Sequence, residues 1–326
     1  MIARNIAWKA GPELQLPPAD RPTIYFIGVT TGQSSIMSVF PKWADFLGLG
    51  DAAIVGIDCR IHDAPSTYRR VVSQIKADPN SRGALVTTHK LDLLNACREL
   101  FDALDPWAEL IGEVSSISKR GTQLIGHAKD PITSGLSLDA ILPANYWAES
   151  GGHLCLLGAG GASEALVCNL LSDDRTDRPR RIVITDRSEH RLAEVKRLHD
   201  RIGRKTDIAY QLAPGATDND AVVNGLPPKS VVINATGLGK DAPGSPLTTA
   251  ATFPRNSVAW DFNYRGDLQF LEQARLQAGT RGVTVVDGWV YFLHGWTRVI
   301  AEVFDIDIPT SGPTFDRLSE IARSVR

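Results

Sequence analysis

His153-Leu-Cys-Leu-Leu-Gly158-Ala-Gly-Gly-Ala-Ser163 is the stretch that decides the fold. The apolar run 153–157 predicts a buried strand, and the glycines after it predict a tight turn that opens a helix over 161–172. Such a turn lets backbone N–H groups at a helix N-terminus approach a phosphate. We therefore expect a dinucleotide pyrophosphate to bind here, with a plain glycine turn as the alternative. The expected binding residues are Gly158, Ala159, Gly160, Gly161 and Ala162.

The next predicted strand, 181–185, ends at Asp186, which follows Ser163 by 23 positions. An acidic residue about 20 positions after the glycine loop binds the ribose hydroxyls of NAD. Arg187 suits a 2′-phosphate, and Arg191 lies one helical turn further on. These two arginines would otherwise be solvated charges on a helix face. The pattern favours NAD narrowly over NADP.

Working outward, strand-like and helix-like segments alternate along the chain, which predicts an α/β fold with mainly parallel sheets. The predicted strands are 23–29, 52–58, 83–87, 113–118, 122–127, 153–157, 181–185, 207–212, 230–235, 257–262 and 283–286. The predicted helices are 36–48, 65–77, 91–104, 131–142, 161–172, 188–202, 218–224, 268–278, 289–304 and 314–325. Residues 1–22 are expected to form an arm before the first strand.

The predicted domains are a substrate-binding, catalytic α/β domain over 1–140 and a Rossmann-type, doubly wound dinucleotide-binding domain over 141–288. The boundary is placed in 131–150, where Pro143-Ala-Asn-Tyr-Trp147 suits a linker or a helix end. The C-terminal helices, about 289–326, are candidates to pack back onto the first domain. A homodimer is one candidate for the oligomeric state, which the sequence does not determine.

The composition is that of an ordinary globular protein. The chain has 326 residues, 43% of them hydrophobic, and a formal net charge of −2. This balance gives no electrostatic case for binding nucleic acid, and no apolar run is long enough to span a membrane. The histidines and cysteines show no metal-binding spacing, so no metal is expected. Buried free thiols in the cytoplasm are expected at Cys59, Cys97, Cys155 and Cys168.

Seven motifs now coincide in order, and through them the chain resembles the shikimate/quinate dehydrogenase family from about residue 24 to residue 305. The motifs are Val86-Thr-Thr-His-Lys90, Gly112-Glu-Val-Ser-Ser-Ile117, Gly126-His-Ala-Lys-Asp130, Gly158-Ala-Gly-Gly-Ala-Ser163, Ile233-Asn-Ala-Thr-Gly-Leu-Gly239, Asp261-Phe-Asn-Tyr264 and Asp287-Gly288. The resemblance implies hydride transfer between NAD(P) and a secondary alcohol or ketone of a small polyhydroxylated cyclic substrate.

The resemblance also implies roles for single residues. Lys90 and Asp130 would be the catalytic pair, which agrees with the chemistry, since alcohol oxidation needs a proton acceptor and a cation beside the developing oxyanion. Asp130 could also simply begin a helix before Pro131. Further expected cofactor-binding residues are Asn234, Thr236 and Gly288. The expected substrate-binding residues are Ser34, Thr87, Ser115 and Tyr264.

The substrate side departs from the family. Of the family's Ser-x-Ser carboxylate anchor, Ser34 is kept and Ile36 replaces the second serine. Ser115 stands where an asparagine is expected, and Ala128-Lys129 replaces the Asn-Thr before the catalytic aspartate. The late glutamine aligns near His294 or Gly295. Replacement contacts could come from His89, His127, Lys129 or His294, each with a surface or core role as the alternative.

Two other functions remain open. The altered anchors favour a non-catalytic sensor that binds a metabolite or cofactor on the same fold, although the retained Lys90 and Asp130 argue against it. A methylene-tetrahydrofolate-type dehydrogenase shares the two-domain layout and a lysine, but fits the Asp130 and Asn234 motifs less well. A small polyol or hydroxy acid is therefore the expected partner, its identity unassigned.

Overall fold

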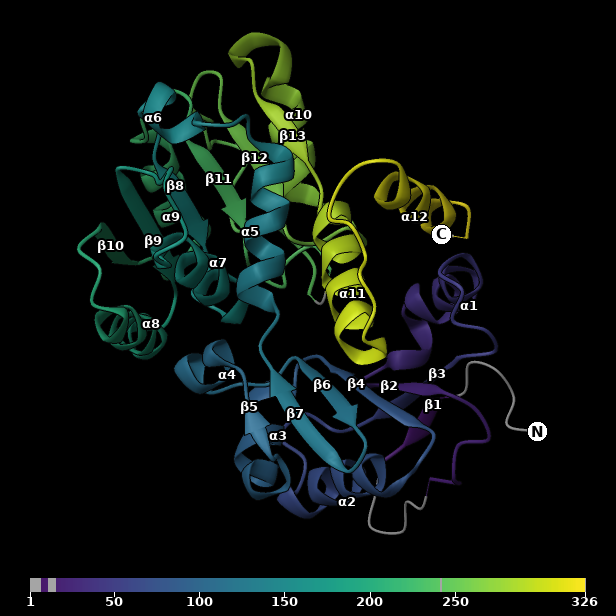
Figure 1. The fold of residues 1–326 in the computed structure, drawn as a ribbon. Helices are drawn as coiled ribbons and strands as arrows, with labels where there is room; N and C mark the ends of the chain where they lie inside the picture. Colours follow the sequence, from purple (N-terminus) through teal and green to yellow (C-terminus); the bar gives the residue numbers. More distant parts are fainter. Residues whose placement is uncertain (1–6, 11–15, 241, 326) are drawn as a thin grey trace. The chain divides into compact units, whose positions relative to one another are not determined.

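A computed structural model describes residues 7–10, 16–240 and 242–325 (Figure 1). The chain divides into two compact units. Unit 1 holds the described residues up to Lys129 and again from Gly295, and unit 2 runs from Asp130 to His294. Each unit combines a sheet with covering helices, which confirms the predicted α/β class.

Unit 1 contains a seven-stranded sheet in the order β1-β3-β2-β4-β6-β7-β5. The first four strands in this order are parallel, and β6 and β7 form an antiparallel hairpin beside β4. The carboxyl ends of β4 and β7 therefore meet at one edge of the sheet. The strands are β1 Ala7–Lys9, β2 Thr23–Gly28, β3 Ala53–Asp58, β4 Ser81–Val86, β5 Ala103–Leu104, β6 Ser116–Arg120 and β7 Gln123–His127.

Helices cover both faces of this sheet. On one face, α2 Pro65–Ala77 and α3 Lys90–Cys97 bury an apolar cluster that includes Val71 and Leu93. On the other face, Phe26 of β2 meets Trp296 with ring centroids 5.1 Å apart. The indole nitrogen of Trp43 donates to the carbonyl of Leu318 at 2.8 Å. The remaining helices are α1 Ile36–Phe46, α4 Pro106–Ile111, α12 Pro313–Arg323 and the part of α11 Trp289–Phe304 that begins at Gly295.

Unit 2 contains six parallel strands in the order β10-β9-β8-β11-β12-β13 (Figure 1). Numbered along this unit alone, the order is 3-2-1-4-5-6, which is the doubly wound arrangement of the Rossmann fold. Ligands of such sheets bind outside the carboxyl ends of the strands, where the order reverses at β8. The strands are β8 Leu154–Leu157, β9 Arg181–Asp186, β10 Asp207–Leu212, β11 Val231–Asn234, β12 Val258–Asp261 and β13 Thr284–Val286.

Two apolar clusters sandwich this sheet, because its buried strands carry apolar side chains on both faces. α5 Asp130–Ile141, α7 Gly161–Leu171 and α8 Glu189–Ile202 cover one face. α9 Ala216–Asn224 and α10 Gln269–Arg281 cover the other. α5 and α7 pack closely, since a Cβ at Gly135 would lie 2.3 Å from the Asn169 side chain.

Most predicted elements are present, and three predictions were wrong. Residues 1–22 are not only an arm, because β1 pairs with β3; residues 1–6 and 11–15 lie outside the description. The helix predicted over 91–104 ends at Cys97, since the chain leaves it to pair β5 with β7. Of the two predictions for Pro143 to Trp147, the helix end is confirmed, because α5 ends at Ile141, and the linker is wrong, because the stretch runs into a further helix, α6 Tyr146–Ser150. The turn between β6 and β7 contains Gly121, which has a φ of 61°.

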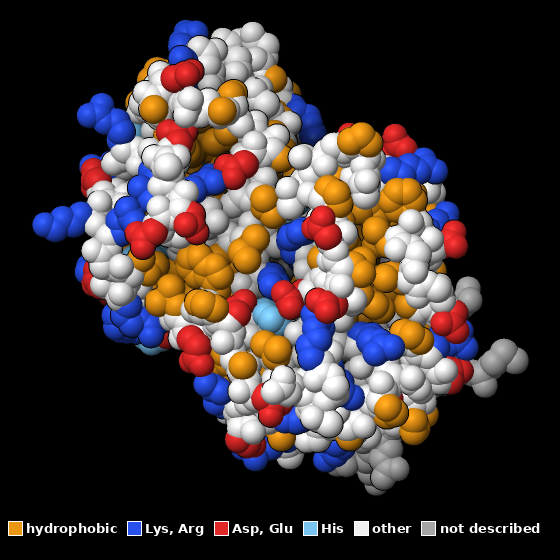
Figure 2. Space-filling view, viewed as in Figure 1, with side chains coloured by type: hydrophobic (Ala, Val, Ile, Leu, Met, Phe, Trp, Pro, Cys, Tyr) orange, Lys and Arg blue, Asp and Glu red, His pale blue; other side chains and the backbone are white. Residues whose placement is uncertain are grey.

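The surface and the thiols agree with ordinary globular composition. The four cysteines are buried and free, as predicted. Lys and Arg are interspersed with Asp and Glu over the face shown in Figure 2. Over the part of the chain that the structure describes, no helix has both the length and the apolar character to cross a bilayer.

Candidate functional site

The glycine loop of unit 2 follows β8 and opens α7, as predicted. Gly158 has a φ of 108°, and a Cβ there would lie 3.1 Å from the carbonyl oxygen of Ala235. The Ser163 hydroxyl donates to the Gly158 carbonyl at 2.5 Å, which closes the turn. A Cβ at Gly160, the N-cap of α7, would meet no atom within 4 Å. The loop therefore leaves open space at a helix N-terminus, where an anion is stabilised.

Asp186 ends β9 beside this loop. One of its carboxylate oxygens accepts the Ala159 N–H and the other accepts the Ser188 N–H, both at 2.9 Å. These two bonds fix the carboxylate against the glycine loop and leave lone pairs for further donors. Ser188 caps α8 through the Arg191 N–H at 3.3 Å, and the side chains of Arg187 and Arg191 are exposed.

A buried polar network joins the carboxyl ends of β11 and β12. Asp261 accepts the Asn234 side-chain amide at 2.9 Å with one oxygen and the Asn263 N–H at 2.8 Å with the other. The Asn234 carbonyl oxygen accepts both the N–H (3.0 Å) and the hydroxyl (2.6 Å) of Thr236. Burial raises the pKa of Asp261 to about 6, against the hydrogen bonds from the two asparagines. Asn234 and Thr236 thus belong to a network that fixes the loop after β11.

Sequence reasoning missed Asp261 and Asn263 as parts of this network. The signal was available, since both belong to the Asp261-Phe-Asn-Tyr264 motif that directly follows a buried strand. Gly288 is held by the same segment: its N–H donates to the Asn263 carbonyl at 3.0 Å, and a Cβ there would lie 2.1 Å from the Phe262 carbonyl oxygen. Tyr264 packs on Phe292 with centroids 4.7 Å apart, so its substrate role stays a prediction.

In unit 1, β4 leads to the predicted catalytic lysine. Thr87 donates its N–H to the Ile27 carbonyl at 2.9 Å, and Thr88 takes a left-handed φ of 59°, which is strained for a β-branched residue. Lys90 begins α3, with its ammonium 3.7 Å from a carboxylate oxygen of Glu113. Sequence reasoning did not assign Glu113, although the Gly112-Glu-Val motif contains it. Lys90 belongs to unit 1 and Asp130 to unit 2.

His89 lies in the core of unit 1. It is 1% exposed, and its Nδ1 is 3.0 Å from the Tyr68 hydroxyl. Burial lowers the pKa of His89, so its neutral form is favoured. Ile36 is fully buried, while Ser34 is half-buried at the end of a short 3-10 turn, Thr31–Gln33. The structure therefore places the isoleucine that replaces the second anchor serine inside the core.

Ser115 connects the segments at the carboxyl edge of this sheet. Its carbonyl accepts the Val86 N–H and its own N–H donates to the His127 carbonyl, both at 2.9 Å. The Ser115 hydroxyl accepts the Lys129 N–H at 2.8 Å. Ser115 thus holds together the ends of β4 and β7, next to the segments that carry Lys90 and Lys129.

Charged groups gather around Glu302 of α11, still within unit 1. The Lys129 ammonium donates to Glu302 at 2.7 Å, and His127 Nε2 and the Arg120 guanidinium lie 3.5 and 3.7 Å from its other oxygen. Burial acts to raise the pKa of Glu302, but the Lys129 hydrogen bond and the neighbouring cationic groups outweigh it, and the pKa lies below its usual range. We call Glu302, Lys129, His127 and Arg120 the Glu302 cluster.

The Glu302 cluster was not foreseen, because Glu302 follows Lys129 by 173 positions. The Ser118 hydroxyl lies 2.8 Å from His127 Nε2, and Asp105 lies 3.6 Å from Nδ1. His127 and Lys129 therefore have protein partners, and their proposed substrate contacts stay predictions. His294 is buried on α11 within unit 2.

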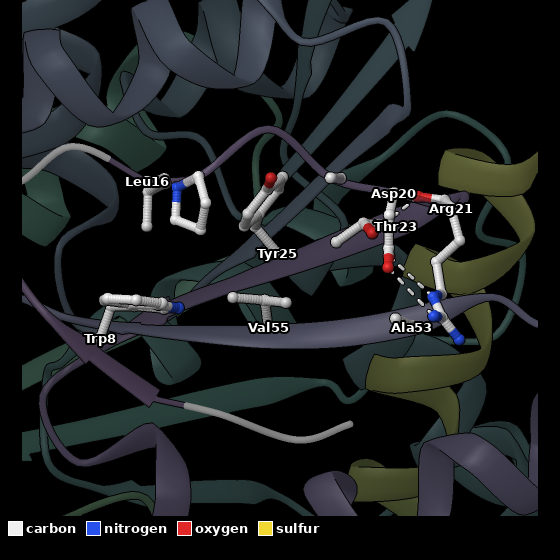
Figure 3. A pocket seen from close by; sticks show the side chains of 10 residues that line it. Trp8, Leu16, Asp20, Arg21, Thr23, Tyr25, Ala53 and Val55 are labelled. Carbon is white, nitrogen blue, oxygen red and sulfur yellow. Dashed lines mark hydrogen bonds and ion pairs between the residues drawn. The ribbon is translucent and has the colours of Figure 1, made fainter. Parts of the chain in front are cut away.

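A pocket in unit 1 lies away from these residues (Figure 3). Thr23 and Ala53, which line it, begin β2 and β3, whereas Lys90 follows the carboxyl end of the parallel strand β4. Its polar groups include the Asp20–Arg21 ion pair at 2.8 Å, drawn in Figure 3. We therefore do not assign the candidate active site to this pocket. Its lining residues are Trp8, Leu16, Pro17, Ala19, Asp20, Arg21, Thr23, Tyr25, Ala53 and Val55.

The fold and the polar groups at the carboxyl edges of the two sheets define a two-unit α/β protein whose unit 2 has the Rossmann topology. No family model matches the chain. A shikimate dehydrogenase (NADP(+)) of Streptococcus thermophilus is 29% identical over 177 residues, covering 54% of this chain. The alignments span 58% and 62% of the length of two such curated relatives.

Solved structures show the same fold over nearly the whole chain. Shikimate 5-dehydrogenase of Listeria monocytogenes, solved with shikimate and NAD, gives a TM-score of 0.69 at 21% identity and covers 95% of this chain and 99% of its own. Quinate dehydrogenase of Corynebacterium glutamicum, solved with NAD, gives 0.72 at 16% identity, covering 93% and 99%. In sequence the chain is similar to shikimate dehydrogenases, and in fold it is similar to shikimate and quinate dehydrogenases.

Proposed function

We propose that this protein is an NAD(P)-dependent alcohol dehydrogenase that acts on a small polyhydroxylated substrate. The observation that carries the proposal is the position of Lys90 at the carboxyl edge of the unit 1 sheet. It follows the strained Thr88, and its ammonium nitrogen lies 3.7 Å from a carboxylate oxygen of Glu113. Named relatives are dehydrogenases, and the motifs through which the chain resembles that family include both Lys90 and Asp130. Ser34, Thr87, Ser115 and Tyr264 remain proposed substrate-binding residues.

In the proposed reaction, Lys90 holds the substrate hydroxyl, relays its proton to Asp130 and stabilises the oxygen that remains. Asp130 also keeps the lysine oriented. The bound nicotinamide cofactor supplies the hydride acceptor. Glu113 would keep the Lys90 ammonium in place between turnovers. The open N-terminus of α7 fits the pyrophosphate, and the network of Asp261 would hold the loop proposed to lie near the nicotinamide.

The test of this function is the Lys90→Ala variant, assayed for cofactor reduction with quinate, shikimate and neutral polyols. We expect kcat to fall about 10²- to 10⁴-fold, the usual contribution of a general acid or base. Lys42→Ala changes an exposed lysine on α1 and should leave kcat unchanged. Unchanged turnover in Lys90→Ala contradicts the assigned role. Cofactor binding by the wild-type protein without any turnover would favour the sensor instead.

For the cofactor we propose NAD as the preferred form. Its support is Asp186, whose carboxylate is fixed by the Ala159 and Ser188 N–H groups and would repel a 2′-phosphate. In Asp186→Ser, we expect the ratio of kcat/KM for NADP to that for NAD to rise at least about tenfold, through removal of that repulsion. Steady-state kinetics with both cofactors measures this ratio. A ratio that stays constant, or a wild-type preference for NADP, contradicts the proposal.

A further inference from the structure

The cations around Ser115 are each held next to a carboxylate of unit 1. Lys129 donates to Glu302 at 2.7 Å, and the side chains of the pair are only 13% and 27% exposed. Lys90 lies 3.7 Å from Glu113, where the exposures are 21% and 15%. Charge pairs this deep are screened little by salt, so the pairing persists in solution. The positive charges of Lys90 and Lys129 are thus already neutralised by carboxylates of unit 1.

The histidines of this region add little free positive charge. His127 lies between Asp105 at 3.6 Å and Glu302 at 3.5 Å. His89 is buried against Tyr68, and burial lowers its pKa, so its neutral form is favoured at neutral pH. The positively charged groups nearest to Ser115 are therefore committed to protein carboxylates.

Lys129 is placed where its charge would act on a substrate. It directly precedes Asp130, and its N–H donates to the Ser115 hydroxyl at 2.8 Å. Ser115 in turn binds the end of β4, three residues before His89 and four before Lys90. A cation at this position would anchor an anionic substrate if it were free. The Glu302 carboxylate occupies it instead.

The two-serine anchor that the resemblance implies for a carboxylate is reduced here to Ser34, because Ile36 is fully buried in place of the second serine. A substrate carboxylate would then have to displace Glu302 from Lys129 or enter without a counter-ion, and a buried charge without enough partners is strongly disfavoured. Hydroxyl and carbonyl groups need only hydrogen bonds, which hydroxyls such as that of Ser115 can supply. We propose that the substrate is an uncharged polyol or its ketone, and that Glu302 sets this preference by neutralising Lys129. This inference rests on the proposed dehydrogenase function and gives its substrate class.

The test compares ligands that differ by one negative charge and one methyl group: quinate against its methyl ester, and shikimate against its methyl ester. With wild-type protein and NAD or NADP, we expect kcat/KM for each ester to exceed that for its acid at least tenfold. Glu302→Gln keeps the shape of the side chain but frees the Lys129 charge. It should lower the ester-to-acid ratio about tenfold, chiefly through a lower KM for the acids.

Two further variants test whether the change in the ester-to-acid ratio comes from Lys129. Adding Lys129→Met to Glu302→Gln should restore the wild-type ratio, because the freed lysine is then removed and Arg120 keeps its carboxylate partner Asp305 at 3.2 Å. Glu320→Gln, which removes an exposed carboxylate paired with Arg317 on α12, should leave the ratio unchanged. A wild-type preference for the acids, or an unchanged ratio in Glu302→Gln, overturns the proposal.

The outcome also separates this inference from the proposed function. Turnover of the acids but not the esters supports a dehydrogenase and overturns the neutral substrate class. If no ligand is turned over, the dehydrogenase function fails, and isothermal titration with the same four ligands decides the charge preference. Tighter binding of the esters then supports the inference, whereas tighter binding of the acids or binding of neither kind overturns it.

Discussion

The carboxyl edges of the two sheets differ in how they use polar side chains. In unit 2, Asp186, Asn234 and Asp261 bind backbone groups and one another, and so fix loops around an open helix N-terminus. In unit 1, Lys90 and Lys129 extend toward carboxylates, and the bonds run between charged side chains. The first edge is a rigid backbone frame that suits a constant ligand such as a dinucleotide. The second is a set of side-chain pairs that substitution can change without changing the fold, and under the proposed function these pairs set the substrate preference.

The largest expected effect tests the rigidity of the unit 2 edge. In Gly288→Ala, the new Cβ would lie 2.1 Å from the Phe262 carbonyl oxygen, so backbone must move. We expect the free energy of unfolding to fall by about 2–3 kcal/mol, as for an overpacked site, with weaker cofactor binding. Urea denaturation and titration with NAD measure both.

Gly279→Ala is the control for this substitution. It lies in α10, and its Cβ would meet no atom within 4 Å, so the free energy of unfolding should stay the same or rise. If Gly288→Ala is as stable as Gly279→Ala and binds NAD equally well, the loop is not the rigid frame described above.

The second prediction concerns Asp261, which is fully buried with a pKa raised to about 6 from the usual 3.8. A raised pKa in the folded state means that the stability this group contributes is present below pH 3.8 and lost as the pH rises through 6. The shift of about 2 pKa units corresponds to roughly 3 kcal/mol. Asp261→Asn cannot titrate, so the wild-type advantage in free energy of unfolding should decline by roughly 2 kcal/mol between pH 4 and pH 6.5, the part of the total that falls within this range.

Urea denaturation of both proteins across this pH range measures the effect. Asp45→Asn, which changes an exposed carboxylate on α1, provides the control and should give a pH profile parallel to that of the wild type. Parallel pH profiles for wild type and Asp261→Asn would show that the carboxylate is not held in the buried network.

The two edges also differ in how far the sequence predicted them. The glycine loop and Asp186 were readable because their chemistry lies within one strand-loop-helix-strand segment, where spacing and backbone geometry are coupled. The Glu302 cluster was not readable, because Glu302 and Lys129 are 173 positions apart and meet only through tertiary packing. The strands β1 and β5 were missed for a related reason: segments of two or three residues carry no periodicity and form only by pairing with neighbours.

The smallest expected effect tests the side-chain pairs of the unit 1 edge. Burial acts to raise the pKa of Glu302, but the Lys129 hydrogen bond and the neighbouring cationic groups lower it below its usual range. The stabilising contribution of Glu302 is therefore present above about pH 4.5 and lost as the pH falls through the lowered pKa.

Glu302→Gln should lower the free energy of unfolding by about 1 kcal/mol at pH 7, a magnitude between exposed and buried pairs. The difference should shrink toward zero as the pH falls through the lowered pKa, because the protonated carboxyl resembles the amide. Glu320→Gln on the exposed pair should change stability by less at pH 7. A Glu302→Gln deficit that is independent of pH would mean that Glu302 acts through packing, and the electrostatic contrast between the two edges would not hold.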